Sequence, residues 1–341
     1  MNFYQKTRNH MNLLAKPLGS LGELEHLAAK VSEAQQIFPP QYHKPKIVIF
    51  AADHGVAIQE KVSLFDSSIT KAMVDTFLSG RAAISVLARL HQASLEIVNC
   101  GVRNYDGPRF KSDPIQYVDA GVSKNPTQNI AIQNAMSKEE CEKALEAGRL
   151  ALRRLQNEGS TIAIAGEMGI GNTTAATSIY CRLLNLPPEQ LTGPGAGLDQ
   201  SGILHKSTII AKALKRSSAK EPLDVLASLG GFEIAALVGF YLEAEAKNIP
   251  VLLDGFICGA ACQIAHGINP DVKRVIIPAT LSGEPHHHKA LSALDMGQPI
   301  LSLGLRLGEG SAAATALPIL KAAIALANEM ATISEVLESL S

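Results

Sequence analysis

The sequence has no tryptophan, few other aromatic residues and almost no net charge, and each shortage narrows what the protein can be. Its 31 basic and 32 acidic side chains leave a formal charge of −1, so a broad electrostatic attraction to nucleic acid or to an anionic membrane is excluded. Hydrophobic residues make up 46% and charged residues 18%, a balance typical of a globular chain. Binding is therefore expected at a local site.

Cysteine and long apolar runs are also scarce. The five cysteines include no Cys-x-x-Cys pair, and scattered cysteines in odd number are typical of buried free thiols in a reducing compartment. The first residues contain no apolar core of signal-peptide length, and no uncharged run of about 18 apolar residues is present. We therefore expect a cytoplasmic protein.

Short β-branched runs alternate with long helical stretches, which is the pattern of a parallel sheet covered by helices. The predicted strands are residues 46–52, 95–99, 161–165, 251–254 and 274–277, and the main predicted helices are residues 68–90, 139–158, 173–184, 231–247 and 255–267. The segment 108–129 is expected to be irregular. The fold class predicted by this alternation is α/β, with a parallel Rossmann-like sheet.

The two ends of the chain differ from the middle. Residues 1–40 contain an amphipathic stretch but no predicted strand, and the last 31 residues begin as an alanine-rich helix. Alanine-rich helices pack closely on one another, so we expect the ends to combine. The predicted organisation is a large α/β domain, residues 41–290, which carries the nucleotide site, and a small helical domain built from residues 1–40 and 291–341.

A glycine-rich loop, GEMGIGNTT at residues 166–174, connects a predicted strand to a predicted helix. Glycine lets the backbone approach an anion, and a helix N-terminus adds unpaired amides and a partial positive charge. The spacing matches neither the dinucleotide fingerprint nor the Walker loop. We expect the loop to bind a phosphate; the alternative is that its glycines only shape a tight turn.

A second glycine-rich segment, residues 192–199, precedes a helix that carries Lys206. A lysine ammonium group can supply a compact countercharge to a phosphate. Taken alone, Lys206 fits better as a solvated surface lysine.

Glu309 lies between Gly308 and Gly310, directly before the alanine-rich helix. Glycines on both sides of a carboxylate allow a ligand to come close, and apolar neighbours such as Leu307 could raise its pKa toward that of a working base. The alternative is an acid that only stabilises the helix N-terminus.

Seven segments together resemble one family, the nicotinate-nucleotide:dimethylbenzimidazole phosphoribosyltransferases, or CobT family. They are KPLGSLGELE (16–25), AADHGVA (51–57), GEMGIGNTTAA (166–176), GPGAGLD (193–199), SLGGFEIAAL (228–237), LDGFI (253–257) and LRLGEGSAAA (305–314). Each is weak alone, but they occur in the family's order over essentially the whole chain.

The resemblance implies transfer of the 5-phosphoribosyl group of nicotinate mononucleotide to 5,6-dimethylbenzimidazole. The products would be α-ribazole 5′-phosphate and nicotinate, in the assembly of the lower ligand of cobalamin. It also implies a homodimer and a reaction without a metal or organic cofactor, because the ring nitrogen of the nucleotide is already cationic and leaves readily.

Carried over residue by residue, the resemblance implies that Glu309 is the catalytic base. The implied substrate-binding residues are Phe65, Glu167, Met168, Gly169, Ile170, Gly171, Asn172, Thr173, Gly193, Lys206, Ser282 and Leu307. Most of these would surround the ribose phosphate, whereas Met168 and Leu307 would lie beside the aromatic base.

Residues 64–73 depart from the family pattern. Where the family usually has polar Ser, Tyr and Gln, this chain has Leu64, Phe65 and Ala72. The base pocket is therefore expected to be more apolar. Two alternatives stay open: the same donor with another acceptor, such as a different benzimidazole, a purine or a phenol, and a catalytically silent nucleotide-binding homologue.

Two histidine features need separate explanations. Residues 286–288 are three consecutive histidines, which cannot all face one metal ion in regular structure and have no carboxylate or cysteine at zinc-like spacing. We expect a polar loop or a phosphate contact there. His54 follows Asp53, but adjacent residues in a turn rarely pair, so a structural role is expected rather than a catalytic dyad.

Overall fold

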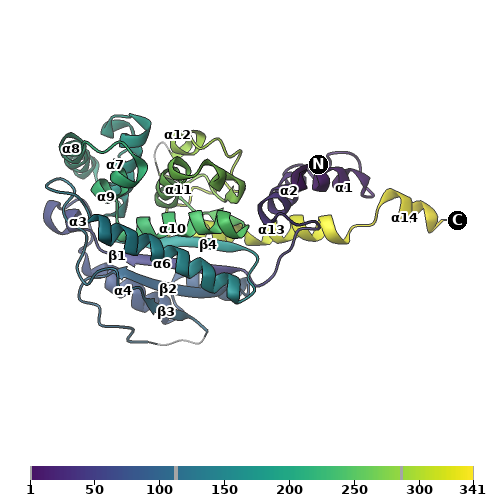
Figure 1. The fold of residues 1–341 in the computed structure, drawn as a ribbon, viewed down its shortest axis with the longest axis horizontal. Helices are drawn as coiled ribbons and strands as arrows, with labels where there is room; N and C mark the ends of the chain where they lie inside the picture. Colours follow the sequence, from purple (N-terminus) through teal and green to yellow (C-terminus); the bar gives the residue numbers. More distant parts are fainter. Residues whose placement is uncertain (1, 111–113, 285–286, 341) are drawn as a thin grey trace.

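A parallel β-sheet with helices on both faces forms the centre of the molecule (Figure 1). The structure, a computed structural model, describes residues 2–110, 114–284 and 287–340, and within them the sheet has six strands in the order β3-β2-β1-β4-β5-β6. The strands are β1 (Lys46–Ala52), β2 (Ser94–Gly101), β3 (Gln116–Asp119), β4 (Ala163–Met168), β5 (Val251–Leu253) and β6 (Ile276–Pro278). The predicted α/β class is confirmed.

The helices account for most of the remaining chain. They are α1 (Phe3–Leu13), α2 (Glu23–Gln35), α3 (Gly55–Glu60), α4 (Ser68–Leu78), α5 (Ala83–Leu90), α6 (Lys138–Asn157), α7 (Asn172–Leu184), α8 (Gln200–Arg216), α9 (Pro222–Leu229), α10 (Phe232–Lys247), α11 (Phe256–Ile268), α12 (His287–Ser292), α13 (Ser311–Glu329) and α14 (Ile333–Glu338). Short 3₁₀ turns lie at Pro188–Gln190 and Pro270–Arg274.

Three sequence predictions about these elements were wrong. The single helix expected at 68–90 is interrupted between α4 and α5, where Gly80 has a left-handed φ of 76°. Strand β3 lies inside the segment expected to be irregular. Strand β4 continues to Met168, so Gly166 belongs to the sheet, paired with Ile49 of β1, and not to the loop.

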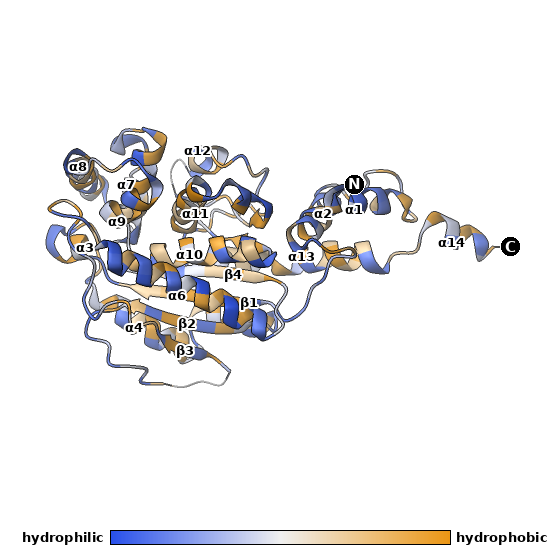
Figure 2. Ribbon diagram, in the orientation of Figure 1, coloured by the Kyte–Doolittle hydropathy of each residue, from blue (hydrophilic) through white to orange (hydrophobic). Residues whose placement is uncertain are grey.

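The two faces of the sheet carry separate hydrophobic cores, and successive side chains of β1 point alternately into one core and the other. Val48 and Phe50 pack in the core beneath α6 and α10, whereas Ile47 and Ile49 pack in the core shared with α2, α5 and α13. All of these side chains are fully buried. Figure 2 shows the same arrangement, because the central strands are coloured toward hydrophobic while the helices carry hydrophilic outer faces.

Helices α6 and α10 pack backbone against backbone on one face of the sheet. A methyl group added at Gly148 would lie 1.8 Å from the carbonyl oxygen of Ala236, and one added at Gly239 would lie 1.9 Å from the carbonyl oxygen of Leu145. Neither distance is sterically possible. The contact therefore requires glycine at both positions.

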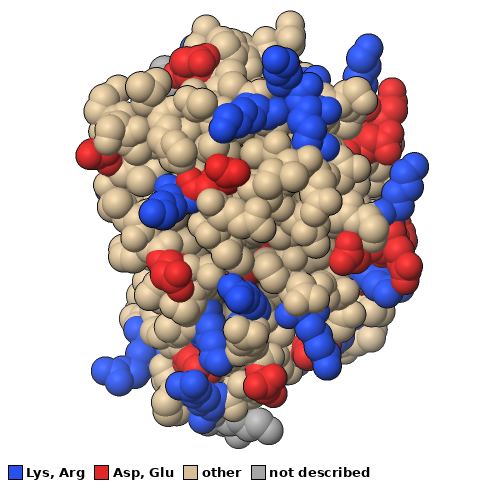
Figure 3. Space-filling model, turned by 90° about the vertical axis from the view of Figure 1, so that its left-hand side faces the viewer, with Lys and Arg blue, Asp and Glu red and all other residues tan. Residues whose placement is uncertain are grey.

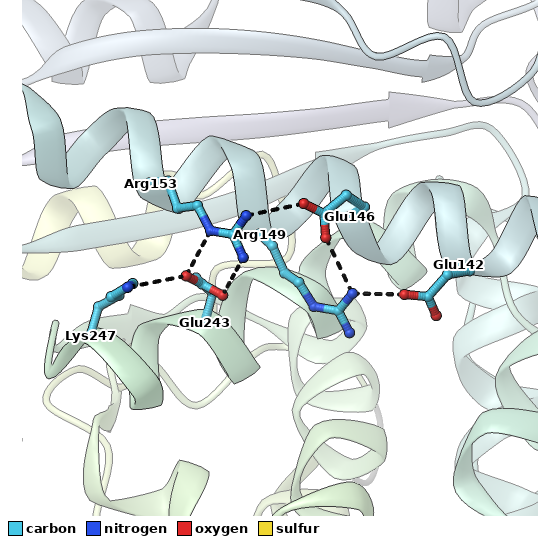
Figure 4. Close-up of polar contacts among 6 residues, drawn as sticks. All are labelled: Glu142, Glu146, Arg149, Arg153, Glu243 and Lys247. Carbon is cyan, nitrogen blue, oxygen red and sulfur yellow. Dashed lines mark hydrogen bonds and ion pairs between the residues drawn. The ribbon is translucent and has the colours of Figure 1, made fainter.

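Ion pairs hold the outer edges of the same two helices together (Figure 4). Arg153 of α6 donates to Glu243 of α10 at 2.9 Å and to Glu146 at 3.2 Å. Arg149 extends the network to Glu142 at 2.8 Å. Because these groups are partly exposed, each pair contributes little alone, and the network mainly fixes the register of the helices.

Helix α13 joins the two ends of the chain to the sheet. Ala313 and Ala314 belong to the core of the sheet, and α13 also packs against α2 and contacts α1. In Figure 1, α1 and α2 lie side by side at one end of the molecule, and α14 extends beyond them. The division into a large domain and a small helical domain remains a prediction. Helix α13, which the sequence analysis assigned to the small domain, also packs in the core of the sheet.

Among the described helices, α13 is long and apolar enough to cross a membrane by length and composition, yet 56% of that stretch is buried inside the fold. Core helices of folded proteins pass the same test.

The face drawn in Figure 3 shows no dominant charge. Lys and Arg are interspersed there with Asp and Glu, as the formal charge of −1 predicts.

We predict that Gly148→Ala lowers the free energy of unfolding by at least about 2 kcal/mol, because the methyl group forces α6 away from α10. Urea unfolding followed by circular dichroism measures the loss. Ser137→Ala is the comparison, since it removes only the capping box of α6, at about 1 kcal/mol. A smaller effect of Gly148→Ala than of Ser137→Ala would contradict the packing argument.

Candidate active site

A cavity of about 570 Å³ opens at the carboxyl ends of the central strands. Such strand ends converge in a parallel sheet, which is why ligands bind there. Strand β4 contributes Glu167, and the segments after β5 and β6 contribute Asp254 and Ser282. The predicted site residues that line this cavity are Phe65, Glu167, Met168, Gly169, Ile170, Asn172, Thr173, Ser282, Leu307 and Glu309.

Lys206, Gly193 and Gly171 do not line the cavity but lie next to it. The buried Lys206 ammonium group donates to Thr173 Oγ1 at 2.7 Å and reaches the carbonyl oxygen of Gly193 at 3.5 Å. Burial lowers the pKa of Lys206 to about 8, and the nearby Glu284 carboxylate opposes that shift. Lys206 is therefore a buried lysine behind a cavity-lining threonine, not a surface lysine.

The glycines of the 166–171 segment make room for neighbouring backbone. A methyl group at Gly166 would lie 2.4 Å from the amide nitrogen of Gly310 and 2.5 Å from the carbonyl carbon of Glu309. One at Gly169 would lie 2.4 Å from the carbonyl oxygen of Ala52. Gly166 thus lets the Glu309 turn approach β4, and Gly169 lets the loop approach β1. The sequence analysis predicted neither contact, because its alternative to phosphate binding was only a tight turn.

Several amides of the loop already have partners within the protein. The Ile170 amide donates to Thr70 Oγ1 at 3.2 Å, and the Asn172 amide donates to the carbonyl oxygen of Gly169 at 3.0 Å. Fewer backbone amides of this loop are therefore free to bind an anion than the sequence predicted. An anion in this part of the cavity would instead meet Thr173, at the N-terminus of α7, with the Lys206 charge behind it.

Glu309 also lines the cavity and is buried, with 5% of its surface exposed. Its backbone has a left-handed φ of 61°, and Gly308 and Gly310 on either side have φ values of 79° and 72°. Burial, followed by the charge of Asp254, raises the pKa of Glu309 to about 7. A carboxylate with this pKa can accept a proton at neutral pH and release it again.

Glu167 and Asp254 lie in the same cavity as Glu309, which Glu284 also lines. Glu167 accepts a hydrogen bond from the Asn172 side chain, and burial, then the charge of Asp254, raises its pKa well above the ordinary value. Asp254 accepts from the Ala313 amide at 2.9 Å, and burial raises its pKa to about 6. The sequence analysis missed Asp254, although an aspartate at the end of a buried strand was a usable signal.

An apolar wall faces these acids. It includes Phe65, Ile69 and Leu307, of which Phe65 is 50% exposed and Leu307 57% exposed. Leu64 and Ala72 do not line the cavity. This segment departs from the family pattern at three positions, and of these only Phe65 lies in the cavity.

Comparison with known proteins accounts for this arrangement. A family model described as phosphoribosyltransferase matches residues 1–336. The chain belongs to this family. A nicotinate-nucleotide–dimethylbenzimidazole phosphoribosyltransferase from Pseudomonas putida is 42% identical over 97% of this chain and 92% of that protein. One from Ectopseudomonas mendocina is 45% identical, with the same coverage.

The fold is also shared with a solved structure. The crystal structure of CobT from Thermus thermophilus superposes with a TM-score of 0.91 at 38% identity, covering 98% of each chain. The family assignment therefore rests on the whole chain and not on the glycine motifs alone.

In this phosphoribosyltransferase His54 does not pair with its neighbour Asp53. His54 Nε2 contacts Glu233 Oε1 at 2.6 Å, and both side chains are fully buried. Burial alone would lower the pKa of His54, but the Glu233 carboxylate raises it above the ordinary value. The imidazole lies beneath Gly169, so the pair supports the site from outside the cavity.

His287 also supports a cavity loop, although it begins helix α12 and does not lie in the polar loop that the sequence predicted. His286 lies outside the described residues, but His287 is buried, and its Nδ1 accepts from the Ser282 amide at 2.9 Å. Burial lowers the pKa of His287 to about 4, so the ring is neutral at physiological pH. Within the described ranges, no cluster of three metal-ligating side chains is found.

We predict that Glu233→Ala lowers the free energy of unfolding by about 3–5 kcal/mol, because it leaves His54 buried without its partner. Chemical unfolding at pH 7 measures the effect. Lys138→Ala breaks an exposed pair with Asp224 and should leave stability nearly unchanged. Equal stability of the two variants would rule out a buried ion pair beneath Gly169.

Proposed function

We propose that this phosphoribosyltransferase moves the 5-phosphoribosyl group of nicotinate mononucleotide onto 5,6-dimethylbenzimidazole. The products are α-ribazole 5′-phosphate and nicotinate, and the step belongs to the assembly of the lower ligand of cobalamin. The observation that carries the proposal is Glu309, a buried carboxylate with a pKa of about 7, in a cavity that is also lined by Thr173, the hydrogen-bond partner of Lys206.

The donor phosphate binds at the N-terminus of α7. Thr173 offers a hydroxyl group there, Lys206 supplies positive charge from behind it, and Ser282 lies on the loop held by His287. Charge-assisted hydrogen bonds to an anion are the strong ones in proteins. Fixing the phosphate places the ribose in the centre of the cavity, so that C1′ faces the acceptor.

The acceptor base lies between the apolar wall and Glu309. One ring nitrogen attacks C1′ while the bond from C1′ to the nicotinate nitrogen breaks, and the bonding electron pair neutralises the cationic ring. The other ring nitrogen gives its proton to Glu309. Attack opposite the leaving group inverts C1′ from β to α, and the step requires no metal or organic cofactor.

We further propose that the enzyme acts in the cytoplasm as a homodimer. Helix α14 supports this part of the proposal, because none of its residues is buried. Ile333, Val336 and Leu337 are 48%, 41% and 61% exposed. Apolar side chains exposed together on one protruding segment are typical of an interface.

Product identification tests the reaction. With nicotinate mononucleotide and 5,6-dimethylbenzimidazole, we expect equal amounts of nicotinate and α-ribazole 5′-phosphate by mass spectrometry. A panel of other benzimidazoles, adenine and phenol checks whether Phe65 changes the preferred acceptor. Tight nucleotide binding by calorimetry, with no nicotinate released for any acceptor, would instead identify a catalytically silent homologue.

The role of Glu309 makes a separate prediction. Glu309→Gln should lower kcat by about 10²–10⁴-fold, because the amide cannot accept the proton, while nucleotide binding by calorimetry stays largely intact. In the wild type, kcat/KM should fall as the pH drops below about 7, since the raised pKa means that the carboxylate is protonated there. A variant with wild-type turnover would remove Glu309 from the mechanism.

A further inference from the structure

The turn that carries Glu309 has a backbone conformation that needs outside support. Gly308, Glu309 and Gly310 are all left-handed, with φ values of 79°, 61° and 72°. Glycine adopts this region freely, but a glutamate does not. Residues in such conformations persist only when the surrounding structure holds them.

The sheet supplies part of this support. The Glu309 backbone amide donates to the Glu167 carboxylate, and the absence of a side chain at Gly166 lets the turn rest on β4. Gly310 lies over the Ile164 side chain of the same strand. These contacts hold the turn on the side of the sheet. A different group contacts the amides at the start of α13.

Asp254 is that group. Gly310 is the N-cap residue of α13 and has no side chain with which to cap the helix. The Asp254 carboxylate, 2% exposed at the end of β5, accepts from the Ala313 amide at 2.9 Å and also from the amides of Ala312 and Gly310. The Asp254 carboxylate thus accepts hydrogen bonds that the side chain of an N-cap residue would usually accept.

Asp254 also lies among the charges that act on Glu309. The charged groups around the cavity are Glu167 on β4, Asp254 after β5, Glu284 after β6, Arg306 before the turn, Lys206 behind Thr173, and Glu233 of α10 behind Glu167. After burial, Asp254 is the charge that shifts the pKa of Glu309 upward. Arg306 donates to the carbonyl oxygen of Gly195 at 2.9 Å.

We propose that Asp254 is a positioning residue for Glu309. Its hydrogen bonds to the start of α13 fix the left-handed turn, and its negative charge makes Glu309 a stronger base. The inference rests on the proposed role of Glu309 as proton acceptor. It assigns Asp254 no contact with the substrate and no proton transfer of its own.

Two substitutions separate the hydrogen bonds from the charge. Asp254→Asn keeps an oxygen that can accept from Ala313 but removes the charge, so the pKa seen in kcat/KM should fall by about one unit. The ratio of kcat/KM at pH 6 to that at pH 8 then rises roughly fivefold. Asp254→Ala removes both functions and should lower kcat by about 10²-fold at every pH.

Asp199→Asn is the matched control, because Asp199 caps α8 through the Gly202 amide at 2.8 Å and does not line the cavity. It makes the same chemical change at another helix start and should leave the pH profile unchanged. A wild-type profile for Asp254→Asn, beside an inactive Glu309→Gln, would overturn the positioning role while leaving the proposed function standing.

A direct titration makes the test independent of turnover. Carbon-13 NMR of labelled carboxyl groups, assigned with Glu309→Gln, should show Glu309 titrating at lower pH in Asp254→Asn than in the wild type. In Glu309→Gln the pKa of Asp254 should stay at about 6, because Glu309 is already protonated at the pH at which Asp254 titrates. An unchanged pKa of Glu309 in Asp254→Asn would sink the inference even in a protein with full activity.

Discussion

The site depends on one close approach of backbone to backbone, where Gly166 of β4 meets the turn at Glu309 and Gly310. No side chain fits between them, since a methyl group at Gly166 would lie 2.4 Å from the Gly310 amide nitrogen. The sheet can therefore place the start of α13 directly on its own surface. Without this approach, Glu309 and Glu167 would not share a cavity.

The approach also determines how charge is arranged around the cavity. Glu167, Asp254 and Glu309 gather where the turn meets the strand ends, whereas Lys206, Arg306 and Glu284 lie toward the loop that contains Gly195. Burial raises the pKa of each of the four carboxyl groups, and the charge of Asp254 raises the pKa values of Glu167 and Glu309 further. Glu309 can therefore exchange a proton near neutral pH, whereas Lys206 and Arg306 oppose the upward shift of the pKa of Glu284.

The sequence predicted much of this architecture, because parallel strands buried on both faces are apolar and short. It could not predict that β4 runs on through Gly166 and Glu167, since a glycine next to a glutamate resembles a loop until pairing with β1 is known. Glu309 was visible through its flanking glycines. Asp254 had a weaker signal, its position at the end of a predicted strand, but its contact with a helix 59 residues later in the chain could not be predicted. The packing of Gly148 against Ala236 likewise depends on a distant helix.

Helix α13 connects the N-terminal helices α1 and α2 to the turn that carries Glu309. Its first turn carries the buried Ala313, next to the cavity, while Leu317 and Leu320 further along are fully buried in the core that also contains Met11 and Val31. Deleting α1 or α2 would expose one side of α13, the helix that follows Glu309. A truncation at the N-terminus is thus a change to the support of the Glu309 turn, although the two lie about 300 residues apart in the sequence.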